Sequence, residues 1–106
     1  MAEQLIQLEQ IKAQKDLVIS NILKYKIIAI FRNISNDEIL CTAEALYNGG
    51  IRLMEVTFDQ SGRFSEEYTA KQISLIASHF GDGLLVGAGT VLTERQVAIA
   101  RDAGAK

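Results

Sequence analysis

The chain has 106 residues, a formal net charge of −2 and 48% hydrophobic residues, which suits one domain with an apolar core. It is not basic enough to indicate nucleic-acid binding, and no apolar run reaches the roughly 20 residues that cross a bilayer. Polar residues interrupt the first ten positions, which argues against a signal peptide and favours a cytoplasmic protein. Cys41 is the single cysteine, so an internal disulfide and a cysteine-rich metal site are excluded, and we expect Cys41 to pack within a helix.

Residues 5–24 have apolar positions at helical spacing, although Lys15 and Ser20 interrupt the pattern. We predict a leading helix within residues 1–25 that packs its apolar face on a larger body. A membrane-surface helix is the alternative, and the mixed signs of its charges count against it.

The next segment reads as a strand followed by a helix. Residues 26–31 form a short apolar run typical of a buried strand. Ser35 has Glu38 three residues later, which is the spacing of a capping box and predicts a helix over residues 36–48. Two glycines follow and end that helix.

The same pattern occurs twice more. An apolar strand over residues 51–57 precedes a helix over 65–80, and Ser65 is its expected N-cap. A third strand starts at residue 84 and leads into a Gly-Ala-Gly-Thr segment. A second capping box, formed by Thr93 and Gln96, then opens a helix that ends near residue 104.

Strands that alternate with helices predict an α/β fold with a parallel sheet and right-handed crossovers. Three such units do not close a barrel, which takes about 200 residues or more. We therefore interpret residues 1–106 as the N-terminal part of a single barrel domain: the first three βα units of a (β/α)8 TIM barrel behind a leading helix. A complete small domain would leave both sheet edges bare, which is an aggregation hazard.

Glu55 lies near the carboxyl end of the second predicted strand, and alternation places it on one face with Leu53 and Thr57. Both faces of this strand are mostly apolar, so the carboxylate would be desolvated and would need a partner. The carboxyl end of a strand is where a general base lies in an α/β barrel. A structural carboxylate that pairs with a neighbouring strand is the alternative.

Arg32 and Thr90 follow the first and third predicted strands. A guanidinium at a barrel mouth suits a carboxylate or phosphate, although a surface arginine at a strand end is equally consistent. Thr90 offers a hydroxyl after two glycines that would let a ligand approach the backbone. The segment lacks the third glycine of a dinucleotide loop, because Leu92 stands there. We expect His79, at a helix end, to be structural.

The Ile-Ile-Ala-Ile-Phe-Arg segment, the Glu-Val-Thr of residues 55–57, Gly-Ala-Gly-Thr-Val and a late Ala-Gly-Ala occur in one order. In this combination the chain resembles the class I 2-keto-3-deoxy-6-phosphogluconate aldolases, which also act on 4-hydroxy-2-oxoglutarate. The resemblance covers about residues 26–106. It implies a (β/α)8 barrel, usually trimeric, that cleaves a 2-keto-3-deoxy acid to pyruvate and an aldehyde through a lysine Schiff base. No metal and no cofactor is implied.

The resemblance assigns roles to three residues. Glu55 matches the glutamate that moves protons, Thr90 matches a threonine that contacts the pyruvyl carboxylate, and Arg32 matches an arginine after the first strand. Some members carry an arginine where this chain has Asp59, so an anion contact there is missing or is supplied by Arg32. The Schiff-base lysine of the family lies on the sixth strand, outside these residues, so we expect the isolated chain to be inactive.

Two other functions stay open from the sequence. One is a non-catalytic half-barrel that assembles with itself or with a partner that supplies the remaining strands. The other is a small phosphate- or nucleotide-binding domain built on the Gly-Ala-Gly-Thr segment and the helix after it. The aldolase interpretation predicts a keto acid substrate, pyruvate as product, a homo-oligomer, and neither nucleic acid nor membrane as partner.

Overall fold

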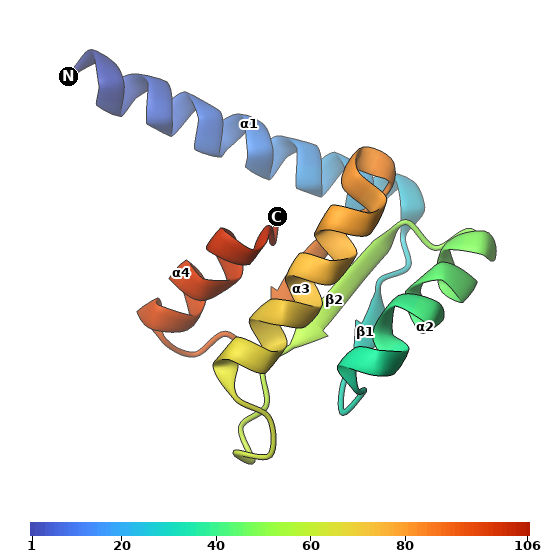
Figure 1. Cartoon of the computed structure of the whole chain (residues 1–106). Helices are drawn as coiled ribbons and strands as arrows, with labels where there is room; N and C mark the ends of the chain where they lie inside the picture. Colours follow the sequence, from blue (N-terminus) through green and yellow to red (C-terminus); the bar gives the residue numbers. More distant parts are fainter.

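The computed structural model describes residues 1–106 and contains a three-stranded sheet with four α-helices (Figure 1). The elements are, in chain order, α1 (Ala2–Tyr25), β1 (Ala29–Phe31), α2 (Asn36–Asn48), β2 (Leu53–Thr57), α3 (Glu66–Phe80), a 3-10 turn (Gly81–Gly83), β3 (Leu85–Gly89) and α4 (Glu94–Ala103). Every predicted strand and helix is present. None of the helices is long and apolar enough to cross a membrane.

The sheet is parallel throughout, with β2 between β1 and β3. Its register places Ile30 beside Glu55 and Glu55 beside Gly87, while Thr57 lies beside Gly89. Because side chains alternate along a strand, these residues share one face of the sheet. We call this the open face. The predicted α/β fold, a partial (β/α)8 barrel behind a leading helix, has this architecture.

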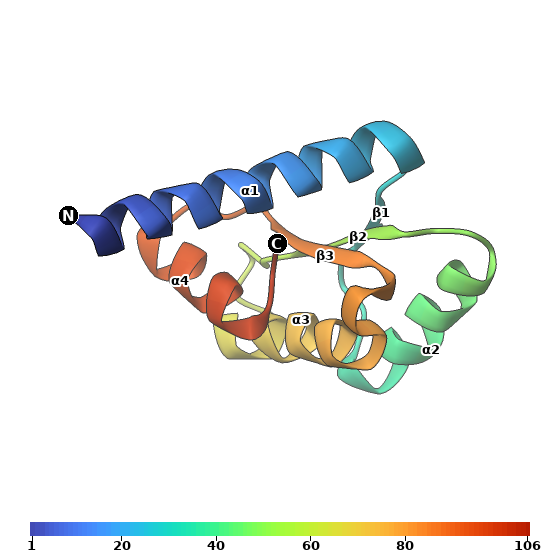
Figure 2. The ribbon, with the colours of Figure 1, turned by 90° about the horizontal axis from the view of Figure 1, so that it is seen from above.

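The opposite face of the sheet carries the hydrophobic core. Helices α2 and α3 cover it, and α4 packs beside α3 (Figures 1 and 2). The core side chains come from all three strands and all three helices, and most are fully buried: Phe31, Ile39, Ala43, Met54, Val56, Phe58, Ile73, Ile76, Leu84, Val86 and Ala100. Burying each large apolar side chain contributes about 1.5–3 kcal/mol, so this face supplies most of the stability.

Helix α1 lies on the open-face side of the sheet, across from α2 and α3 (Figure 2). Its C-terminal half reaches the sheet, where Val18 and Ile22 line a pocket with Leu53 and Val86. No residue of α1 is buried, and its N-terminal end lies away from the strands (Figure 1). The predicted leading helix is therefore present, and within these residues only its C-terminal half packs on a larger body.

The strands begin later than the apolar runs indicated. Lys26 adopts a left-handed φ of 68° that ends α1, and the Ile27 N–H donates to the Tyr25 carbonyl, so β1 starts only at residue 29. Before β2, the Ile51 N–H donates to the Leu46 carbonyl and continues the cap of α2. These local hydrogen bonds take up backbone groups that the predicted strands would have used.

Two of the three predicted N-caps form as expected. The Ser65 hydroxyl accepts from the Tyr68 N–H, and the Thr93 hydroxyl accepts from the Gln96 N–H. Ser35 occupies the N-cap position of α2, but its hydroxyl makes no capping hydrogen bond, so the first capping box is wrong.

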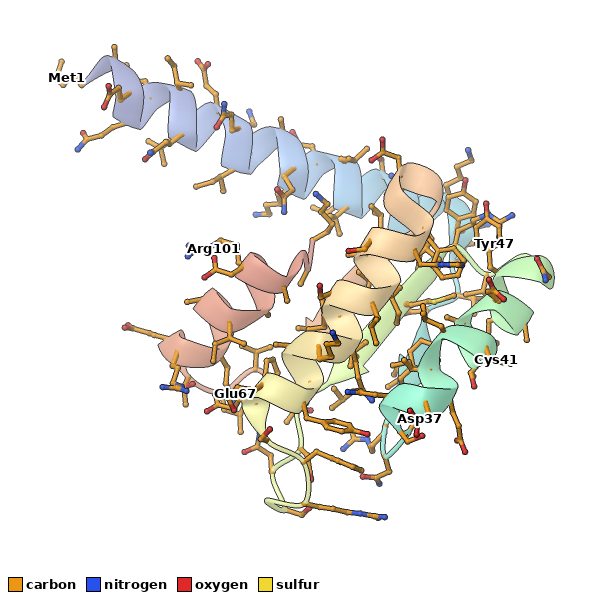
Figure 3. All side chains as sticks on the ribbon, in the orientation of Figure 1. Met1, Asp37, Cys41, Tyr47, Glu67 and Arg101 are labelled. Atoms are coloured by element: carbon orange, nitrogen blue, oxygen red, sulfur yellow. The ribbon has the colours of Figure 1, made fainter.

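Cys41 lies in a helix, as predicted, but the expected packing of its side chain is wrong. It is exposed on α2 and has no disulfide partner (Figure 3). The side of α2 that faces the core carries Ile39 and Ala43, which are fully buried. Cys41 lies two residues from each of them and is therefore turned to the solvent side of the helix.

Candidate active site

The carboxyl ends of the three parallel strands meet at one edge of the sheet. Glu55 belongs to β2, while Arg32 follows the end of β1 and Thr90 follows the end of β3. The structure therefore brings the three sequence-predicted residues to the same edge. That edge is where the loops of an α/β barrel build the active site.

Glu55 is half-buried on the open face, and two neighbours define where its carboxylate lies. The Thr57 hydroxyl donates to Glu55 Oε2 at 3.2 Å. On the other side, Gly89 of β3 leaves the space that the carboxylate fills, since a Cβ on this glycine would overlap Oε2 and Cδ. The carboxylate thus has a hydroxyl partner and lies against a neighbouring strand, with no cation paired to it.

Thr90 has a φ of 53°, in the left-handed region that β-branched residues rarely adopt. Such a conformation costs about 1–3 kcal/mol and is retained where the surroundings hold it. Gly89, just before it, accepts a hydrogen bond from the Phe58 N–H at 3.0 Å, which ties the ends of β2 and β3 together. The backbone at Thr90 therefore turns sharply out of a fixed strand end.

Arg32 is exposed, and its side chain forms no ion pair or hydrogen bond with the rest of the chain. It lines a cleft of about 140 Å³ with Asn33, Thr57 and Asp59, between the ends of β1 and β2. Its guanidinium is free to bind an anion that enters from the mouth of the sheet, as a fork that matches a carboxylate or phosphate.

Asp59 organises the loop that follows β2. Its carboxylate accepts from the Ser61 hydroxyl at 2.7 Å, from the Ser61 N–H at 2.9 Å and from the Phe64 N–H at 2.9 Å. These hydrogen bonds, with the Ser61 hydroxyl foremost, lower the pKa of Asp59 below its usual 3.8. Asp59 is therefore ionised and committed to the loop, and it adds negative charge at the cleft that Arg32 lines.

No lysine lies at this edge. Lys12, Lys15 and Lys24 belong to α1, and Lys71 belongs to α3. The remaining two lysines, Lys26 and Lys106, lie at the opposite edge, where strands begin. His79 is also distant from the site: its Nε2 lies 2.7 Å from Glu44 Oε1, in a contact between α3 and α2, which agrees with the structural role expected for it.

Two features of the site were not predicted from the sequence: Gly89 is a neighbour of the glutamate, and Asp59 organises the loop. Thr57 was placed on the face of Glu55, and alternation alone could have suggested their contact. Gly89 becomes a neighbour of Glu55 only through the register of β2 and β3, which no local pattern in the sequence reveals.

Comparison with known proteins identifies the family of this chain. The family described as "Aldolase: KDPG and KHG aldolase" matches residues 18–106, which include all three strands and the three residues at the carboxyl edge. This chain belongs to the KDPG and KHG aldolase family. The resemblance inferred from the sequence motifs is confirmed.

One relative in this aldolase family is a 2-dehydro-3-deoxy-phosphogluconate aldolase of Haemophilus influenzae, 33% identical over 88 residues. The match covers 83% of this chain and 38% of the relative, so the chain spans well under half of that protein's length.

Solved structures show the same likeness. A structure titled "Native KDPGal structure" matches with a TM-score of 0.61 and 33% identity, over 74% of this chain and 35% of that one. A cube-shaped protein cage designed by fusing symmetric oligomeric domains matches with a TM-score of 0.63 and 32% identity, over 74% and 27%. The partial-barrel fold predicted from the sequence is thereby confirmed.

Proposed function

We propose that this chain is the N-terminal part of a class I aldolase barrel that cleaves a 2-keto-3-deoxy sugar acid, phosphorylated or not, or 4-hydroxy-2-oxoglutarate. The products would be pyruvate and an aldehyde. The observation that carries the proposal is the half-buried Glu55 carboxylate at the carboxyl edge of the sheet, in a chain of the KDPG and KHG aldolase family. An aldolase of this kind needs a group that moves protons beside the reacting carbons.

In the proposed reaction, a lysine amine condenses with the substrate ketone, releases water and forms an imine. A base then takes the proton from the C4 hydroxyl, and the C3–C4 electron pair moves toward the imine, which yields an enamine and the free aldehyde. Protonation at C3 and hydrolysis release pyruvate and restore the amine. We assign these proton transfers to Glu55.

The two other site residues would bind the substrate. Thr90 would donate its hydroxyl to the pyruvyl carboxylate, and Arg32 would bind an anionic group at the mouth of the barrel. The lysine would come from a sixth strand outside these 106 residues, so this chain alone would not turn over. We further propose that the complete protein is a homo-oligomer, and a trimer by analogy with the family.

Trapping of the imine tests this function. The full-length protein is incubated with pyruvate and borohydride, and its intact mass and labelled peptide are determined. We expect one reduced pyruvate on a single lysine outside residues 1–106. A full-length protein that turns over the keto acid without forming any adduct would contradict the Schiff-base mechanism.

A second candidate function is a non-catalytic half-barrel that pairs with another copy or with a partner. The observation that favours it is the exposure of Ile28 and Ile30, at 42% and 60%, on the open face at the unpaired edge of β1. Sedimentation of the purified protein separates the two functions. A stable dimer of 106-residue chains without adduct formation would favour assembly.

A further inference from the structure

The Glu55 carboxylate lies between a buried hydroxyl and the bare backbone of a neighbouring strand. Thr57 lies two residues along β2 on the same face and is only 7% exposed. Its hydroxyl donates to Glu55 Oε2 at 3.2 Å. Gly89 of β3 lies directly beside Thr57 in the register and presents bare backbone to the same carboxylate.

Of the two glycines in β3, only Gly89 has the Glu55 carboxylate in the place where a side chain would lie. A Cβ built on Gly89 would overlap Oε2, Cδ and Cγ of Glu55 together, whereas a Cβ on Gly87 would approach only the Lys106 carbonyl oxygen, at 3.8 Å. The two glycines belong to the same strand and the same face. Gly89 has no positive φ, so its lack of a side chain provides room for the carboxylate and not backbone freedom.

The two supporting groups are also fixed relative to each other. The Phe58 N–H, one residue after Thr57, donates to the Gly89 carbonyl at 3.0 Å. The ends of β2 and β3 therefore cannot separate without breaking this hydrogen bond. A carboxylate lodged between them has little freedom to rotate away.

We propose that Thr57 and Gly89 are positioning residues for Glu55: Gly89 provides the space in which its carboxylate lies, and the Thr57 hydroxyl fixes Oε2 by a hydrogen bond. This inference rests on the proposed function, in which Glu55 moves protons. Neither residue touches the reacting atoms. They set the distance and angle at which Glu55 meets them, and a displacement of about 1 Å can cost about a hundredfold in rate.

The test separates imine formation from proton transfer in the full-length protein. Borohydride trapping of pyruvate reports the imine, and exchange of the pyruvate methyl protons with deuterated solvent, followed by NMR, reports proton transfer at C3. Five variants are compared: Glu55→Gln, Thr57→Val, Thr57→Ser, Gly89→Ala and Gly83→Ala. Thr57→Ser keeps the hydroxyl, and Gly83→Ala adds the same methyl group just before β3, away from the carboxyl edge, where it would only touch the Tyr47 side chain, at 3.4 Å.

We expect Glu55→Gln to slow exchange by about a hundredfold or more. Gly89→Ala should slow it by about a hundredfold through displacement of the carboxylate, and Thr57→Val by about tenfold through loss of one hydrogen bond. In Thr57→Val trapping should persist, while Thr57→Ser and Gly83→Ala should exchange at close to the unsubstituted rate.

The outcomes distinguish this inference from the function on which it rests. If Glu55→Gln exchanges normally, Glu55 is not the proton carrier and both fail. If Glu55→Gln is slow but Thr57→Val and Gly89→Ala are not, the positioning role is overturned and the proposed function stands. Loss of trapping in Thr57→Val where Glu55→Gln still traps pyruvate would make Thr57 merely structural and would also overturn the inference.

Discussion

At the residue scale, the site contains one side chain that neighbouring groups fix in place, Glu55, and one that is exposed and unpaired, Arg32. Glu55 is lodged between a hydroxyl and a glycine, whereas Arg32 is exposed and has no partner within the chain. A group that transfers protons benefits from a fixed position, and a group that captures a charged substrate benefits from reach. The different environments of the two residues match the different roles that we propose for them.

Arg32→Ala should therefore raise KM more than it lowers kcat in the full-length protein. Loss of a charge-assisted hydrogen bond to a bound anion corresponds to about tenfold or more in affinity, provided the bond forms equally in ground and transition states. Steady-state kinetics with the keto acid measure both constants. Arg95→Ala is the control, because Arg95 pairs with Glu66 and Glu67 on the outer surface. A fall in kcat at unchanged KM would contradict an anion-binding role.

The sequence was sufficient to predict which residues reach the carboxyl edge, because strand alternation and strand ends are local properties. It located Glu55, Arg32 and Thr90 there. It could not show that Gly89 receives the Glu55 carboxylate, because that contact joins two strands whose register is set by the whole sheet. The catalytic and binding roles of the three residues stay predictions.

At the element scale, the helix starts show where local rules hold and where tertiary contacts replace them. Ser65 and Thr93 cap α3 and α4 with their hydroxyls. At the start of α2, the Glu38 N–H donates to the Ser35 carbonyl at 3.1 Å and not to its hydroxyl, while the Asn36 N–H donates to the hydroxyl of Tyr68 in α3 at 2.8 Å. The capping-box pattern at Ser35 predicted the correct start of α2 but the wrong hydrogen bond, since the backbone carbonyl of the same residue accepts from the N–H that the hydroxyl would have capped.

This difference predicts unequal costs for two matched substitutions. Thr93→Ala removes a capping hydrogen bond and should destabilise the protein by about 1 kcal/mol. Ser35→Ala removes a hydroxyl that caps nothing and should change the free energy of unfolding by less than about 0.5 kcal/mol. Urea denaturation of the two variants measures both values. Equal losses would show that the Ser35 hydroxyl does cap α2 in solution.

At the scale of the whole molecule, the two faces of the sheet differ sharply. Helices α2, α3 and α4 cover one face and bury its side chains, while only the end of α1 reaches the other (Figure 2). The apolar spacing of α1 indicated burial, but a periodic pattern cannot say whether the surface that covers it belongs to the same stretch of chain. The sequence pattern likewise could not show that Ile28 and Ile30 are exposed in this chain. Their exposure depends on whether other segments cover the open face.

A closed barrel would cover the open face, and this predicts the stability of two isoleucine variants in the full-length protein. Replacing Ile76, which lies on α3 and is fully buried against the sheet, by alanine should cost about 2–5 kcal/mol. Ile30 is 60% exposed in this chain, yet it points to the side that the remaining strands of a barrel would enclose.

Ile30→Ala should therefore cost about 2 kcal/mol or more in the full-length protein, close to the loss for Ile76→Ala, as measured by urea denaturation. Leu92→Ala is the control, because Leu92 is 67% exposed after the end of β3 and its loss should stay within about 0.5 kcal/mol. If Ile30→Ala costs no more than Leu92→Ala, the open face is not covered in the full-length protein. The barrel interpretation of this chain would then be wrong, because a barrel interior has no room for a solvent-exposed isoleucine.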